Sequence, residues 1–64
     1  MDWRVYYDLQ AMINNAQAEI YLIRQQRYLS FEKMFDRVNA IELFINECVH
    51  FQVLLRISNP GVQF

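Results

Sequence analysis

The chain has 64 residues, of which 55% are hydrophobic and only 20% are charged, with six Lys and Arg against seven Asp and Glu. One domain, spanning 1–64, is the most that this length allows, and a monomer of this size buries too little surface to offset the entropy of folding. The single cysteine excludes an internal disulfide, and a net charge of −1 gives no basic field for nucleic acid. The composition therefore predicts a chain that completes its core with a partner.

The first half of the chain is expected to form one helix over about residues 2–28, with Asp2 as its N-cap. Apolar residues recur there at alternating spacings of three and four, which is the heptad pattern of a helix that packs along one stripe. The members of this first seam are Tyr6, Leu9, Ile13, Ala16, Ile20 and Ile23. The next positions in the pattern are Arg27 and Ser30, so the seam is predicted to stop before them.

A second helix is expected over about residues 31–58, where the same alternation restarts in a different phase. The second seam consists of Phe31, Met34, Val38, Ile41, Ile45 and Cys48. Ser30 is the expected N-cap, because serine oxygens accept hydrogen bonds from the first free N–H groups of a helix. Leu29 and Met34 occupy the two positions of a hydrophobic staple, which would hold the start of this helix in place.

Two alternatives compete with two separate helices of these lengths. One continuous helix would place Arg27, Ser30 and Arg37 on its seam, where polar residues make it the less favourable solution. Residues 51–58 also alternate like a strand, but a helix there gives the two arms an equal length of about 40 Å. The proline and glycine in the short tail 59–64 are expected to end the second helix.

The two matched seams predict an all-α fold, a two-helix antiparallel hairpin that pairs into a homodimeric four-helix bundle. Aromatic residues beside the seams would widen the apolar faces and offer a surface to another protein. These residues are Tyr21, Tyr28, Phe35, Phe44 and Phe51. The expected function is a non-enzymatic protein-interaction module, such as an adaptor, a co-chaperone or a regulator. An obligate subunit of a hetero-oligomeric helical assembly is an alternative with the same architecture.

Two short motifs could carry chemistry, and helical geometry argues against both. Glu47 and His50 form a Glu-x-x-His motif, but both belong to the polar arc of the second helix and point away from a bundle core. Cys48 and His50 are two residues apart, so their side chains diverge and cannot share a proton. The sequence contains no phosphate-binding loop and no nucleophile elbow. We therefore expect no catalytic residue, no metal, no cofactor and no small-molecule substrate.

Four cations are expected near the tip of the hairpin, namely Arg24, Arg27, Lys33 and Arg37. Glu32 and Asp36 partly offset them, so binding of RNA or an acidic partner by this patch is an alternative and not the main expectation. The predicted layout resembles the plasmid regulator Rop, a two-helix hairpin that dimerises and binds paired RNA loops. It is also similar to the small helical-hairpin co-chaperones of type III secretion. The first resemblance implies an RNA-binding regulator that uses the tip, and the second implies a protein-binding chaperone.

The sequence predicts a cytoplasmic localisation for the chain. A single free cysteine and the lack of an export signal indicate a reducing compartment. The most apolar stretch, residues 38–57, is interrupted by charged and amide side chains that are costly in lipid. No membrane span is therefore expected.

Overall fold

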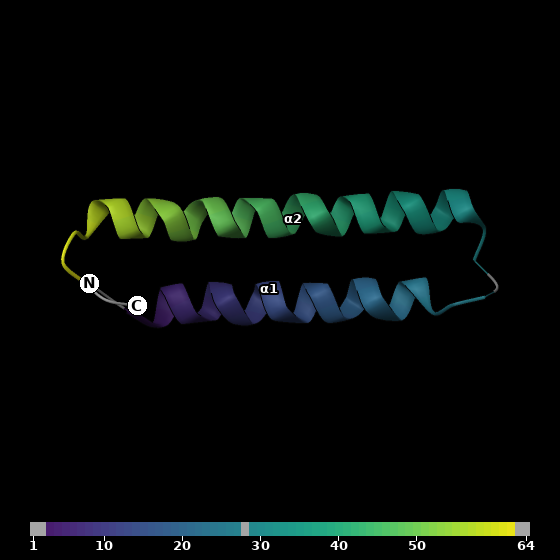
Figure 1. Cartoon of the computed structure of the whole chain (residues 1–64), viewed down its shortest axis with the longest axis horizontal. Coiled ribbons are helices and arrows are strands. Elements are labelled where there is room, and N and C mark those ends of the chain that lie inside the picture. Colours follow the sequence, from purple (N-terminus) through teal and green to yellow (C-terminus); the bar gives the residue numbers. More distant parts are fainter. Residues whose placement is uncertain (1–2, 28, 63–64) are drawn as a thin grey trace.

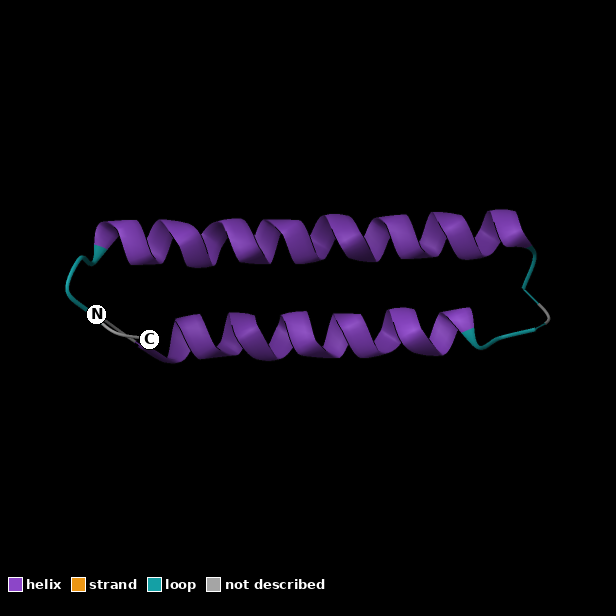
Figure 2. Cartoon of the chain, viewed as in Figure 1, coloured by secondary structure: helices purple, strands orange, loops and turns teal. Residues whose placement is uncertain are grey.

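The described part of the chain forms two helices, which a short loop joins and which lie side by side in opposite directions (Figure 1). The computed structural model describes residues 3–27 and 29–62. Helix α1 spans Trp3–Arg24 and helix α2 spans Phe31–Ser58, with 22 and 28 residues. The molecule is a rod of 48 × 14 × 12 Å, in which the loop joins the helices at one end only (Figure 2). The all-helical hairpin predicted from the two seams is confirmed.

Helix α1 ends earlier than the boundary at 28 that the sequence suggested. The N–H groups of Gln25 and Gln26 each donate to the carbonyl three residues earlier, at 3.1 Å, which tightens the last turn and closes the helix. Arg27 occupies the next seam position and is exposed, so a further turn would bury no apolar side chain there. Tyr28 and the expected N-cap Asp2 lie outside the described residues.

Ser30 is the N-cap of α2, as the sequence predicted. Its backbone is extended, with φ −64° and ψ 152°, and its Oγ accepts a hydrogen bond from the N–H of Lys33 at 3.3 Å. Leu29 and Met34, the expected staple residues, both pack against the same buried cluster. The chain therefore breaks between two helices where the phase of the apolar pattern changes, and the single continuous helix is excluded.

Helix α2 is uninterrupted over residues 51–58, so the strand-like alternation there belongs to the helix. Just beyond it, Nδ2 of Asn59 donates to the carbonyl of Leu55 at 2.9 Å. The N–H of Val62 donates to the carbonyl of Asn59 at 3.2 Å, which closes a turn. Gly61 lies inside this turn with φ +90°, a backbone conformation that glycine adopts without steric cost. The turn ends α2 where the sequence predicted.

The core is one layer of side chains between the two helices. On α1 the buried side chains are Tyr6, Ile13, Ala16, Ile20 and Ile23, and on α2 they are Val38, Cys48 and Gln52. Leu9, Met34, Ile41 and Ile45 complete the two seams as half-buried residues. No described side chain is completely buried, because each helix can cover only one side of the other. The seam pattern therefore locates the contact between the helices, and this contact is thin.

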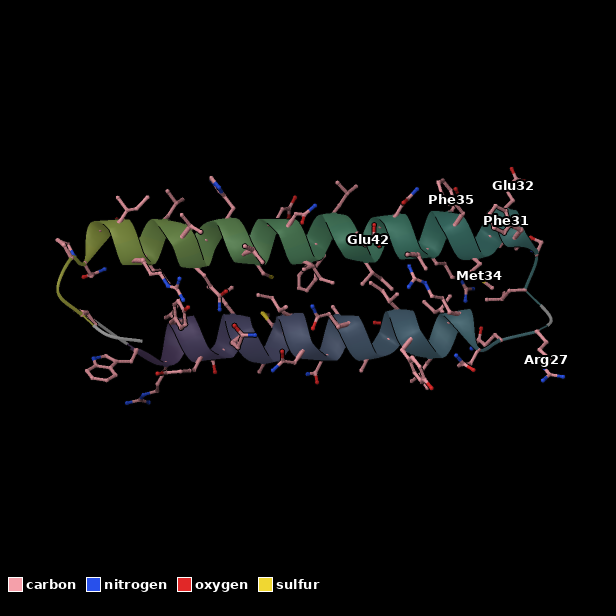
Figure 3. All side chains as sticks on the ribbon, in the orientation of Figure 1. Arg27, Phe31, Glu32, Met34, Phe35 and Glu42 are labelled. Carbon is pink, nitrogen blue, oxygen red and sulfur yellow. The ribbon has the colours of Figure 1, made fainter. Side chains whose placement is uncertain are left out.

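Phe31 departs from the predicted seam, because its side chain is 81% exposed. The cause is the early end of α1 at Arg24, which leaves Phe31 without a helical turn opposite it in the antiparallel pair. Phe31 instead stacks on Phe35, one turn further along α2 (Figure 3). Their ring centroids are 6.2 Å apart and their planes differ by 21°.

Helix α2 is long and apolar enough to cross a membrane by length and composition alone, and most of its apolar stretch is not buried in the hairpin. Glu42 and Glu47 lie near the middle of this helix, where an acidic side chain costs about 3 kcal/mol at the centre of a bilayer. The exposed apolar residues that raise its hydropathy equally suit contact with another helix. The expectation that the chain does not enter a membrane stays a prediction.

Candidate functional site

A polar cluster joins the helices at the open end of the hairpin, where α1 begins and α2 ends. Nε2 of Gln52 donates to the carbonyl of Tyr6 at 3.3 Å and to Oε1 of Gln10 at 3.1 Å. A guanidinium N–H of Arg56 donates to the Tyr6 hydroxyl, and the guanidinium carbon lies 5.4 Å from the centre of the Tyr6 ring. Gln52 is buried, and no buried polar side-chain atom of the described residues lacks a partner. These bonds fix which turn of α1 lies beside which turn of α2.

A second polar contact crosses between the helices nearer the loop, where Nη2 of Arg24 lies 3.9 Å from Oε1 of Glu42. At 100° per residue, Tyr6, Gln10 and Arg24 lie within about 40° of one another around α1. Glu42 and Arg56 lie within about 40° of one another around α2. The polar contacts between the helices therefore share one side of the hairpin, which we call the bridged face.

The other side of the hairpin carries an open groove between the helices. Two adjoining hollows of about 420 and 500 Å³ form it, and they share Glu19, Ala40 and Ile41. The rest of the lining is Met12, Asn15, Ala16, Leu22 and Ile23 from α1, Gln26 just beyond the end of α1, and Arg37 and Phe44 from α2. Glu19 lies about 140° around α1 from Arg24 of the bridged face. We call this side the groove face.

Large apolar side chains are exposed on every side of the hairpin. They are Trp3, Val5, Tyr7, Met12, Tyr21, Leu22, Phe31, Phe35, Leu43, Phe44, Val49, Phe51, Val53, Leu54 and Ile57. Single exposed apolar residues are common on soluble proteins, but extended apolar surfaces mark places where another molecule binds. The chemistry that the hairpin offers is therefore apolar contact over a large area.

The described members of the aromatic set predicted to form a partner surface do not lie together. Tyr21, Phe35, Phe44 and Phe51 are exposed, and Tyr28 lies outside the described residues. Phe35 and Phe44 are nine residues apart, which places them on opposite sides of α2. Phe44 lines the groove, and Phe35 does not. The structure thus divides the aromatic residues between two surfaces.

The predicted basic patch is also divided. Arg24 pairs with Glu42 on the bridged face, whereas Arg37 lines the groove on the opposite side. Arg27 extends away from both helices at the loop (Figure 3), and Lys33 lies in the first turn of α2. These four cations surround the loop end without forming one continuous basic surface.

Glu47 and His50 line a hollow on α2 together with Leu43, Asn46 and Phe51, a set that includes no residue of α1. Both are exposed, whereas the thiol of Cys48 is buried on the side that faces α1. The His, Cys, Asp and Glu residues of the described chain form no group of three or more that could hold a metal ion. The expectation that these side chains carry no acid–base or nucleophilic chemistry stays a prediction.

Sequence reasoning missed the polar cluster at the open end. The second seam continues beyond Cys48 with the same alternation of four and three residues, through Gln52, Leu55 and Asn59. Gln52 is buried and the other two are half-buried. An amide at a seam position was a signal for a buried hydrogen bond, and extending the pattern by one heptad would have found it.

No protein-family model matches the chain, and no curated protein or solved structure shows a significant similarity to it. Its function must therefore be inferred from the surfaces of the hairpin itself.

Proposed function

We propose that this chain is a non-enzymatic protein-interaction module that pairs with a second copy into a four-helix bundle. The observation that carries the proposal is the surface area of the hairpin. Its accessible surface is 5237 Å², whereas a compact monomer of 7.8 kDa exposes about 4,400 Å². The excess of about 850 Å² is close to the roughly 800 Å² that each partner buries in a standard interface.

Pairing would also supply the missing layer of the core. Ile41 is half-buried in the hairpin and lines the groove, and Met12 and Phe44 stand exposed beside it. Two hairpins packed face to face enclose such residues between four helices instead of two. A small chain that has no disulfide gains stability most directly in this way.

The apolar surface that a dimer leaves uncovered would hold another protein. The stacked pair of Phe31 and Phe35 suits this role, because aromatic rings that project from a helix fill pockets on a partner with little loss of conformational entropy. The chain would then act as an adaptor, co-chaperone or regulator in the cytoplasm, without a cofactor or a small-molecule substrate.

Sedimentation equilibrium and circular dichroism test the proposal. We expect a predominantly helical spectrum and a mass of twice 7.8 kDa at micromolar concentration. A well-folded monomer at high concentration contradicts the dimer. An insoluble or molten product from the chain expressed alone supports instead an obligate subunit of a hetero-oligomeric helical assembly.

The exposed Phe31–Phe35 pair also favours a second candidate, an RNA-binding regulator that uses the loop end. Unpaired bases stack on aromatic rings, and Arg27 and Lys33 belong to the same end of the molecule. A titration with a fluorescent RNA stem-loop at several salt concentrations separates the candidates. Affinity that falls steeply with salt supports RNA binding, and no binding at physiological salt supports the protein-interaction module.

A further inference from the structure

We propose that the second copy docks on the groove face and not on the bridged face, an inference that rests on the proposed dimer. The first reason is that the bridged face already holds the polar contacts between the helices. A partner on the bridged face would have to cover the Arg24–Glu42 ion pair, whose desolvation opposes binding. The groove face presents Met12, Leu22 and Phe44 instead, and covering these side chains favours binding.

The second reason is shape. Packed helices insert the side chains of one into the gaps of the other, and the distance between them falls where small residues line the contact. Ala16 is buried at the floor of the groove, and Ala40 is exposed on its α2 side. Phe44 lines the same hollow and is 42% exposed, so it offers a projecting ring beside the two alanines. A surface that combines gaps and a projecting ring is complementary to a copy of itself.

The third reason is charge. Glu19 and Arg37 line the same hollow of the groove, and neither forms an ion pair with another described residue. In a two-fold symmetric contact each patch meets its own copy. A two-fold axis parallel to the helices places α1 of one copy over α2 of the other, which brings Glu19 toward Arg37 of the partner subunit twice. A groove with one charge of each sign therefore suits a second copy of this chain.

The length of the groove agrees with this occupant. Its lining on α1 runs from Met12 to Ile23, which is about 17 Å along the helix. This length is about three turns, enough for the side chains of another hairpin to interdigitate along the middle of the rod. The occupant of the groove face is thus the groove face of the second copy, with the Phe44 ring of each placed against the alanines of the other.

Charged substitutions on the two faces test this assignment. We expect Phe44→Glu and Ala40→Glu to raise the dissociation constant of the dimer by about 100-fold or more, measured by sedimentation. The matched controls are Phe35→Glu, an equally large change outside the groove, and Leu43→Glu, next to Phe44 in sequence. Phe35 is 56% exposed and Leu43 is 65% exposed, so neither substitution removes a buried contact within the hairpin. Both controls should keep the dissociation constant within about threefold of the wild type.

The outcomes separate this inference from the dimer itself. A wild-type chain that stays monomeric overturns the proposed dimer and this inference together. A wild-type dimer that Phe35→Glu or Leu43→Glu dissociates, while Phe44→Glu leaves it intact, overturns the assignment of the face alone.

Thiol labelling tests the same assignment without breaking the interface, in case the charged variants fail to fold. In a Cys48→Ala background, Ala40→Cys places a thiol in the groove and Leu43→Cys places one outside it. At concentrations where the dimer dominates, we expect a thiol reagent to modify the groove position at least about tenfold more slowly. The difference should disappear on dilution into the monomer. Equal rates at both positions in the dimer overturn the docking of the second copy on the groove face.

Discussion

The two ends of the contact between α1 and α2 are held together in different ways. Near the loop, Ile20, Ile23 and Val38 form a wholly apolar cluster, and half-buried apolar residues surround it. At the open end, the buried contact is built from Gln52 and Tyr6, whose polar groups bond to each other and to their neighbours. The same helical hairpin therefore contains one segment stabilised by apolar burial and another ordered by hydrogen bonds.

Because of this difference, the stability of the contact and the alignment of the two helices depend on different ends of the hairpin. Apolar side chains attract one another without directional preference, so the cluster near the loop tolerates small shifts of one helix along the other. The hydrogen bonds of Gln52 have defined partners, and a shift of one turn would leave a buried amide unpaired. We infer that the loop end supplies most of the free energy of the contact, and that the open end selects one alignment.

The largest expected effect belongs to the apolar end. Ile20→Asp places a carboxylate in the buried cluster and removes the packing of an isoleucine that is 9% exposed. The two losses together are about 5 kcal/mol or more per chain, comparable with the whole stability of a small domain. We expect circular dichroism at micromolar concentration to show loss of most of the helical signal.

The control for this substitution is Asn14→Asp on the same helix. Asn14 is exposed, and its Oδ1 accepts a hydrogen bond from Nε2 of Gln10 at 3.1 Å, which an aspartate oxygen can also accept. The control should change the free energy of unfolding by no more than about 0.5 kcal/mol. If Ile20→Asp keeps the helicity and mass of the wild type, the apolar cluster does not hold the hairpin together.

The apolar end was predictable from the sequence because its residues obey one simple period. Ile20, Ile23 and Val38 fall on seams that the spacing alone defines, and Ser30 marks the break between them. The end of α1 was less predictable, since no glycine or proline marks it and the helix closes through its own last turn. Phe31 is exposed in the hairpin for the same reason, because α1 ends at Arg24 and provides no turn opposite it.

A smaller effect is expected from the polar end. Gln52→Ala removes a buried side chain with two hydrogen bonds, so the free energy of unfolding should fall by about 2 kcal/mol in urea titrations. Gln52→Leu keeps the volume and removes the amide, and we expect it to cost less than about 1 kcal/mol. Such a difference would show that the amide selects the alignment more than it stabilises it. An equal loss in both variants would assign the stability to the hydrogen bonds themselves.

The groove face was only partly predictable. Phe44 was identified because it flanks the second seam, but Ala40 and Leu22 carry no signal that distinguishes them from other surface residues. The groove stays open on the side of the hairpin that lies away from the polar contacts between the helices. Arg24 and Glu42 are 18 residues apart, and their contact follows from the register of the hairpin and not from any local pattern. The local spacing of apolar residues predicts the two helices. Which residues of α1 lie beside which residues of α2 depends on the alignment of the helices, and the spacing does not give this alignment.

Loss of the N-cap of α2 should have an effect of about 1 kcal/mol. Ser30→Ala removes the oxygen that accepts a hydrogen bond from the N–H of Lys33 and leaves that group to water. The free energy of unfolding at fixed protein concentration measures the loss. Ser58→Ala, at the exposed last residue of the same helix, is the matched control and should be neutral within about 0.5 kcal/mol. A Ser30→Ala chain as stable as this control would show that the packing of Leu29 and Met34 on the buried cluster fixes the start of α2 without the cap.

The smallest effect is expected at the ion pair on the bridged face. The side chains of Arg24 and Glu42 are 60% and 52% exposed, so solvent screens their attraction. Forming the pair also restricts the rotamers of both side chains, which costs conformational entropy. Glu42→Gln should therefore lower the free energy of unfolding by no more than about 0.5 kcal/mol, and high salt should abolish the difference from the wild type. Glu47→Gln, an exposed acid without a cation opposite it among the described residues, is the matched control. A loss above about 1 kcal/mol in Glu42→Gln alone would mean that the pair is desolvated in the assembled protein. That result would place a partner on the bridged face and so contradict docking on the groove face.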